Sequence, residues 1–316
     1  MDTNKLLVSA SPHICDNSAT RKLMGHVCLA LLPLVVASFI IFGPRALLVE
    51  GVTVLACVFF EWAYCRLMKQ PNPIGDLSAI VTGLILALNL PVTIPIWIAV
   101  IGAFVAIVVV KQLFGGIGCN FANPALVGRI VLAVGFAGRM TAYGFPKTNI
   151  DALAGATPLV AGHSVAGKDM LVPLLLGTHG GVLGETCAIA IVLGGVYLIA
   201  MRVISPVIPL AYLGTVAAMS ALLGQDVILQ LLSGGLLFGA FFMATDYVTS
   251  PFTRSGKLVY AIGLGVITCV IRFYGNMAEG VSYSILLMNL FVPYINNLTR
   301  QTVLGSKKKA IGGAKK

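Results

Sequence analysis

Residues 23–42 read LMGHVCLALLPLVVASFIIF, a run of twenty residues without an acid, a lysine or an arginine. A helix of about 20 apolar residues is long enough to cross a hydrocarbon core of ~30 Å. The run therefore predicts a membrane-spanning helix, and similar runs recur along the rest of the chain.

The composition of the whole chain agrees with this prediction. Of its 316 residues, 58% are hydrophobic and 10% are charged, whereas an average soluble domain is roughly 25% charged. A soluble globular protein is therefore excluded, and so is a disordered chain, which requires low hydrophobicity. The alternating pattern of an outer-membrane barrel is absent from the sequence. The remaining class is an all-α polytopic membrane protein.

Ten apolar stretches follow one another and predict ten transmembrane helices. Their approximate bounds are 23–42, 46–66, 76–90, 94–113, 124–138, 184–203, 206–224, 226–248, 257–275 and 280–298. The first twenty residues are polar, so we expect no cleavable signal peptide. The first span is expected to direct the chain to the bacterial cytoplasmic (inner) membrane.

Basic residues predict the orientation of these spans. Fifteen of the 21 lysines and arginines, Lys111 among them, fall on the side of the two termini, against four on the opposite side. Cytoplasmic segments carry the excess of Lys and Arg, so both termini are predicted to be cytoplasmic. The net charge of +10 then requires no nucleic-acid partner, and the C-terminal lysines are expected to contact anionic lipid.

One long connection divides the chain. The expected divisions are a cytoplasmic segment 1–22, a five-helix half 23–138, an extracytoplasmic loop 139–183, a second five-helix half 184–298 and a basic cytoplasmic tail 299–316. An odd number of spans in each half would give an inverted 5+5 repeat. In support of this, residues 82–86 resemble 234–238, and residues 114–120 resemble 273–276. In the loop, the apolar run 171–177 is too short to span and is expected to lie on the membrane surface or on a partner.

The glycine-rich stretch 113–125, LFGGIGCNFANPA, separates two predicted helices. Its free backbone groups would suit an anion or the edge of a flavin ring, because glycine lets a ligand approach the backbone closely. The alternative is a tight cytoplasmic turn in which Asn123 caps a helix that begins at Pro124. Cys119 would suit a metal shared with a partner, whereas the seven cysteines show no metal-binding spacing within this chain.

Charged residues at the ends of predicted spans are a further group of candidates. Acids inside membranes are costly and tend to have functions, so we predict an ion pathway at Asp76, Asp246 and Glu279. Glu50 and Glu61 raise the same question. The alternative role for such an acid is to cap a helix. Arg129 and Arg272 would neutralise an acid or a phosphate, or extend to the membrane interface.

The predicted outer loop contains the stretch 151–159, DALAGATPL. Taken alone it is a turn of small residues. The same small residues leave the hydroxyl group of Thr157 accessible to a modifying enzyme, so an attachment site at this threonine is the alternative.

Five motifs in order make the chain resemble a known family. They are residues 115–125, 155–158 (GATP), 180–186 (GGVLGET), 243–246 (MATD) with 249–251 (TSP), and 279–283 (EGVSY). Together they resemble the D subunit of the Rnf ferredoxin:NAD oxidoreductase complex, which is related to the B subunit of the sodium-pumping NADH:quinone reductase. The resemblance covers essentially the whole chain.

The resemblance implies two flavins. FMN would be joined through its phosphate to the hydroxyl of Thr157, within a site formed with Asp151, Gly155, Ala156 and Pro158. Ala154 replaces the serine or threonine that is usual in this motif, which puts the efficiency of attachment in doubt. A second, noncovalent flavin such as riboflavin is implied near Gly116, Asn120 and Asn123.

The function implied by the resemblance is electron transfer between ferredoxin and NAD, coupled to transport of Na+ or H+. The chain would not be catalytic alone: NAD and ferredoxin would bind other subunits, because it has no strand-associated GxGxxG and no cysteine cluster. The implied partners are subunits of the A, B, C, E and G types, membrane lipid and a flavin transferase. The alternatives are a permease or channel without redox chemistry, and a structural scaffold; neither would require a flavin at Thr157.

Overall fold

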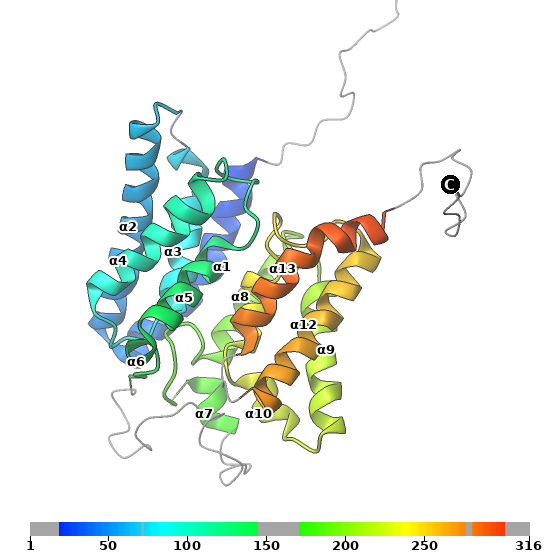
Figure 1. Cartoon of the computed structure of the whole chain (residues 1–316). Helices are drawn as coiled ribbons and strands as arrows, with labels where there is room; N and C mark the ends of the chain where they lie inside the picture. Colours follow the sequence, from blue (N-terminus) through cyan, green and yellow to red (C-terminus); the bar gives the residue numbers. More distant parts are fainter. Residues whose placement is uncertain (1–18, 71–72, 145–170, 178, 276–279, 301–316) are drawn as a thin grey trace, which may run out of the picture.

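The computed structural model describes residues 19–70, 73–144, 171–177, 179–275 and 280–300. Within these residues the chain is helical, and an isolated β-bridge joins Gly144 to Gly181. The predicted all-α class is therefore confirmed. The helical elements form two groups that lie side by side, one from each end of the chain (Figure 1).

The first group comes from the N-terminal part of the chain. Its elements are α1 (Thr20–Phe42), α2 (Pro44–Leu67), the short η2 (Ile74–Asp76), α3 (Ser78–Leu88), α4 (Ile96–Phe104), the π-helical η3 (Val105–Gln112), α5 (Pro124–Gly135) and α6 (Ala137–Met140). The sharp change of direction between α1 and α2 occurs at Gly43, whose φ is 83°. Pro44 then begins α2, because proline suits the first position of a helix.

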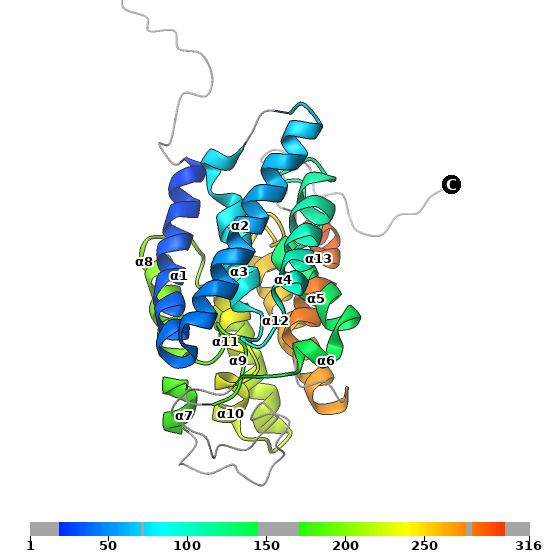
Figure 2. The ribbon, with the colours of Figure 1, turned by 90° about the vertical axis from the view of Figure 1, so that its left-hand side faces the viewer.

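The second group comes from the C-terminal part. Its elements are α7 (Leu171–Leu176), α8 (Ala188–Ala200), α9 (Val207–Leu222), α10 (Val227–Leu232), α11 (Leu236–Phe238), the π-helical η5 (Gly239–Met243), α12 (Arg254–Tyr274) and α13 (Gly280–Leu298). In both views α6, α7 and α10 lie at the same end of the molecule (Figures 1 and 2). The predicted outer loop is connected to this end.

Small residues allow the two groups to pack closely. Helix α8 packs against α1, and α5 packs against α13. At Gly194 of α8, an added Cβ would lie 2.3 Å from the carbonyl oxygen of Ala30 in α1. Only glycine permits this approach of the two backbones.

Three helices, α1, α2 and α12, are long and apolar enough to cross a membrane by length and composition. Five shorter apolar helices lie at 78–88, 96–112, 124–135, 188–200 and 207–222. Together with the family described below, they indicate a multi-pass membrane protein. The number of ten spans remains a prediction.

One predicted span is wrong as a continuous helix. The stretch expected to span at 226–248 is broken between α10 and α11, where Gly234 and Gly235 have φ values of 70° and 65°. These left-handed conformations end a helix, and glycine adopts them readily. The chain then resumes as α11 and η5, so the element consists of two short helical pieces.

Helix α3 is also short, and its end is covered by another part of the chain. Its eleven residues extend about 16 Å. The backbone N–H of Gly184 donates to the carbonyl of Leu88 at 2.7 Å, and that of Leu183 donates to Leu90 at 3.1 Å. The motif GGVLGET thus supplies a hydrogen bond to the last carbonyl of α3 and another to Leu90, which follows the helix.

The similar stretches 82–86 and 234–238 do not occupy equivalent positions in the structure. Residues 82–86 lie inside α3, whereas Gly234 and Gly235 lie before α11, so the two similar stretches occupy different positions. The matching backbone positions are Leu77 and Gly235. Each precedes a half-length helix and is left-handed, with φ values of 64° and 65°.

Candidate functional site

A cavity of about 100 Å³ lies between the two groups of helices. The lining comes from α1, α3, η3, the stretch 117–124, the end of α8 with residues 203–204, and η5 with residues 245–248. Most of the wall is apolar, and its polar members are Ser78, Thr82, Lys111, Asn120, Asn123, Thr245, Asp246 and Tyr247.

Both π-helical segments contribute to this wall. Leu113 N–H bonds to the carbonyl of Val108 in η3, and Ala244 N–H bonds to the carbonyl of Gly239 in η5, each five residues back. A π-helical turn changes the direction of the side chains that follow it and is frequent at functional sites. Lys111 from η3 and Phe241 from η5 both line the cavity, one from each group of helices.

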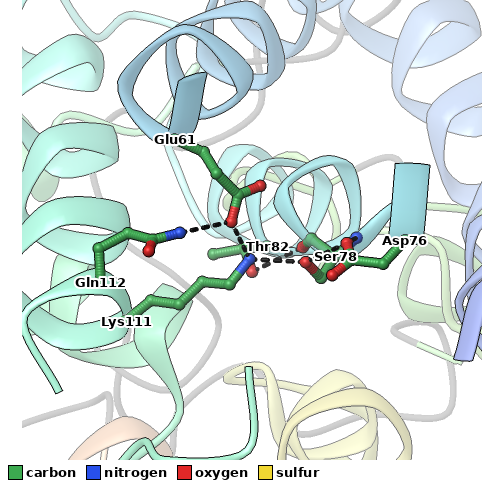
Figure 3. A network of polar contacts seen from close by, with 6 residues as sticks. All are labelled: Glu61, Asp76, Ser78, Thr82, Lys111 and Gln112. Atoms are coloured by element: carbon green, nitrogen blue, oxygen red, sulfur yellow. Dashed lines mark hydrogen bonds and ion pairs between the residues drawn. The ribbon is translucent and has the colours of Figure 1, made fainter. Parts of the chain in front are cut away.

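A buried ion pair lies at the first-half wall of the cavity (Figure 3). Lys111 Nζ is 2.6 Å from Glu61 Oε1, and the two side chains are 3% and 0% exposed. Lys111 also donates to Ser78 Oγ at 2.6 Å, and Gln112 donates to Glu61 Oε1 at 2.7 Å. Because two charges removed from water cost several kcal/mol each, such a pair requires these additional hydrogen bonds.

The network continues to the beginning of α3. Asp76 Oδ1 accepts from the backbone N–H of Ser78 at 2.8 Å and from its hydroxyl at 2.5 Å. Asp76 therefore binds the first residue of α3, as expected for a carboxylate at the beginning of a helix. Its role in an ion pathway stays a prediction. Within the described residues, Glu61 Oε2 is buried and accepts no hydrogen bond.

The opposite wall carries Asp246, which follows η5. The hydroxyl of Thr249 donates to Asp246 Oδ2 at 3.1 Å. Tyr247 donates its hydroxyl to the carbonyl of Val203, which joins this segment to the end of α8. The cavity thus has a cation from the first half and a half-buried acid from the second half.

The residues predicted for a noncovalent flavin divide between two roles. Asn123 Oδ1 accepts from the N–H groups of Ala125 and Leu126 at 3.1 and 3.4 Å, so the predicted helix cap is confirmed. Asn123 and Asn120 both line the cavity, and the buried Oδ1 of Asn120 has no hydrogen-bond partner in the described residues. Gly116 has a φ of 90° and lies outside the lining.

The two arginines of the predicted spans make hydrogen bonds that the sequence did not predict. Arg129 is 4% exposed and donates to Asn89 Oδ1 at 2.7 Å. Arg272 donates to the carbonyls of Gln230, Ser233 and Gly234 at 2.7–3.1 Å. These contacts join the guanidinium groups to an amide and to backbone carbonyls. The neutralisation of an acid or a phosphate by either arginine stays a prediction.

Lys111 is a second correction. Its position at the end of a predicted span placed it among the cytoplasmic, topogenic residues. The π-helix continues through Gln112, so the ammonium group stays inside the protein and pairs with Glu61. The sequence shows Glu61 near the end of the second predicted span and Lys111 near the end of the fourth. Neither their spacing nor the periodicity of the spans predicts that the two side chains meet.

Several candidates lie outside the described residues: Asp151, Gly155, Ala156, Thr157, Pro158 and Glu279. Of the others, Glu50 accepts from the hydroxyl of Ser38 at 2.6 Å, and Cys119 is exposed. Among the described residues, no three His, Cys, Asp or Glu side chains lie close enough together to hold a metal ion.

Comparison with known proteins places this fold and cavity in a family. The model of the NQR2, RnfD, RnfE family matches residues 7–305. The chain is 44% identical to the D subunit of the Na+-translocating ferredoxin:NAD+ oxidoreductase complex of Acetobacterium woodii, covering 98% of each chain. It is 39% identical to the D subunit of the proton-translocating ferredoxin:NAD+ oxidoreductase complex of Clostridium ljungdahlii, covering 96% of this chain and 98% of the relative.

A third relative, the D subunit of the ion-translocating oxidoreductase complex of Stutzerimonas stutzeri, is 40% identical, with 91% of this chain and 93% of the relative covered. The family match extends over both groups of helices and over every residue of the cavity wall. The chain is therefore a member of the NQR2, RnfD, RnfE family.

Proposed function

We propose that the chain is a membrane subunit of an ion-translocating ferredoxin:NAD+ oxidoreductase complex and that it carries electrons by means of bound flavin. Relatives of 39–44% identity over nearly the full length bear names of such complexes. The observation that carries the proposal is the cavity between the two groups of helices, which two π-helical segments and Lys111 of a buried ion pair line. A permease or a scaffold does not explain the names of these relatives.

The proposed noncovalent flavin fits the chemistry of the cavity. A flavin ring has apolar faces and a pyrimidine edge with one N–H donor and two carbonyl acceptors. Phe241, Phe242 and Ile204 provide apolar wall, and the free Oδ1 of Asn120 provides an acceptor for the N–H group. Riboflavin or FMN held here would supply the electron chemistry, while the protein supplies position and electrostatics.

The proposed covalent FMN at Thr157 rests on the sequence 151–159 and its resemblance to the family motif. The described residues on either side of this loop are fixed. The β-bridge joins Gly144 to Gly181, and α7 packs against α8 and α10. A flavin on this loop would remain near the end of the molecule that carries α6, α7 and α10. A covalent bond would also prevent its loss to the solvent.

The transported ion is proposed to be Na+ or H+, since one relative is named for each. Carboxylates serve both ions. The inverted 5+5 repeat is also proposed. It is supported by the left-handed residues Leu77 and Gly235 before the half-length helices, and by Lys111 and Arg272, each of which binds the beginning of such a helix in its own half.

Ultraviolet fluorescence of the chain on a denaturing gel tests the covalent flavin. The chain is produced together with a flavin transferase, and peptides from 151–159 are analysed by mass. We expect a fluorescent band with FMN on Thr157, loss of the band in T157A and its retention in the loop control T148A. A wild-type chain without flavin would overturn this part of the proposal and favour the permease.

A further inference from the structure

Lys111 is placed between the cavity and a buried acid. Its side chain lines the cavity, while its ammonium group is bonded to Glu61 and Ser78 (Figure 3). Glu61 does not line the cavity and is fully buried behind it. An occupant of the cavity therefore lies closer to the positive end of this pair than to its negative end.

We infer that Lys111 raises the reduction potential of the flavin proposed for this cavity, and that Glu61 holds the ammonium group and offsets part of its charge. The inference rests on the proposed function. Reduction by two electrons, which the complex supplies, and one proton from solvent leaves the isoalloxazine ring with one negative charge. A cation beside the ring stabilises this reduced form more than the neutral oxidised form, because the interaction acts in a low dielectric.

The position of the pair determines the sign of its effect. If the two charges were equally distant from the ring, their effects would largely cancel. Lys111 reaches the wall because η3 is π-helical, whereas Glu61 projects from α2 behind it. Asp246 lines the same cavity from the second half and opposes the effect of Lys111. Removal of the acid behind the wall should therefore act in the opposite direction to removal of the lysine.

The test measures the reduction potential of the noncovalent flavin in the full chain purified from membranes. The parent carries T157A, so that covalent FMN is absent from the spectrum, and the variants are E61Q, K111M and E61Q/K111M. The control is Lys257→Met, which removes a cation from α12 outside the cavity wall.

We expect E61Q to raise the potential and both K111M variants to lower it. Each shift should be at least tenfold in the equilibrium constant, which for a two-electron couple is about 30 mV. K257M should leave the potential unchanged. K111M leaves Glu61 buried without its partner and is the variant most prone to unfold. If K111M unfolds, the reduction potentials of the parent, E61Q and E61Q/K111M test the inference without it.

Shifts of the same sign in E61Q and E61Q/K111M, or no shift in either, would overturn the inference and leave the pair a structural role. The failure of the proposed function has a different result. In that case the parent chain itself releases no flavin on acid treatment, and no potential can be assigned to any variant.

Discussion

Gly184 allows the segment 180–186 to approach the end of α3 closely. Its N–H group donates to the carbonyl oxygen of Leu88. A Cβ added at Gly184 would lie 2.7 Å from the Cβ of Leu88 and 3.0 Å from its carbonyl oxygen. Neither neighbour is the flexible end of a side chain, so the segment itself would have to move. Gly184 of the motif GGVLGET is therefore required for packing, in addition to any role in function.

Gly184→Ala should lower the free energy of unfolding by about 1–3 kcal/mol, because the new methyl group overpacks the end of α3. Thermal unfolding of the detergent-solubilised protein measures the change. Gly51→Ala is the control, since nothing lies within 4 Å of its added Cβ. The control should be neutral or stabilising by up to about 1 kcal/mol, and equal losses in the two variants would contradict this account.

His179 predicts a dependence of stability on pH. It is 9% exposed, and its Nδ1 lies 3.3 Å from the carbonyl oxygen of Pro173 in α7. Burial lowers the pKa of its imidazole below the ordinary value of 6.5. The unfolded chain therefore takes up this proton first, so stability present above pH 6.5 is lost as the pH falls through the lowered pKa.

Unfolding temperatures measured from about pH 8 to about pH 5 test this prediction. The wild-type protein should lose more stability over this interval than His179→Gln, which has no imidazole to titrate. The effect should be confined to the acidic part of the range. Parallel curves for the two proteins would exclude His179 as the group responsible.

At the scale of the element, the beginnings of α3 and α11 each bind a cation from another helix. Arg272 in α12 donates to three carbonyls of residues 230–234, directly before α11. Lys111 in η3 donates to Ser78, the first residue of α3. Arg272 binds backbone carbonyls at a position where the chain has left the helical hydrogen-bonding pattern, and such contacts allow a membrane protein to hold a broken helix.

Arg272→Met should loosen the break between α10 and α11. Loss of charge-assisted hydrogen bonds costs about 2 kcal/mol, which makes amide hydrogen exchange in residues 230–238 roughly 30-fold faster. Arg272→Lys should recover part of the protection, because lysine keeps the charge and loses the planar fork. Arg254→Met, at the exposed beginning of α12, is the control and should leave this segment unchanged. The account fails if exchange in the two methionine variants is the same.

At the scale of the whole molecule, the cavity exists because two groups of helices meet. Its walls come from both groups, and the close approach of α1 and α8 at Gly194 brings them together. The stretch that carries Asn120 and Cys119 lies at the end of η3, away from α6, α7 and α10 (Figure 1). The predicted orientation places this stretch in the cytoplasm.

Labelling of Cys119 tests that orientation. It is the exposed residue among the six described cysteines. In a Cys15→Ser chain, a membrane-impermeant maleimide should label Cys119 in inside-out vesicles and not in right-side-out vesicles. A Thr141→Cys variant without Cys119 carries its thiol at an exposed position on the predicted outer side and should show the opposite pattern. Labelling of Cys119 from outside would reverse the predicted topology.

The sequence by itself determined the membrane class, most of the helical stretches, the cap at Asn123 and the family. These properties depend on local quantities, which are the length of an apolar run, the residue before a proline and the order of short motifs. A continuous eighth span was predicted incorrectly, because Gly234 and Gly235 are both compatible with a membrane helix and became a break only where Arg272 binds the freed carbonyls.

Only the tertiary structure determined the cavity and its charges. Lys111 and Glu61 are fifty residues apart in the chain, and either one alone is typical of the end of a membrane span. Their pairing depends on the π-helical turn that directs Lys111 inward and on the packing of α2 against η3. A buried ion pair is stable only when both partners and their additional donors are assembled, and that condition belongs to the packed molecule rather than to any single segment.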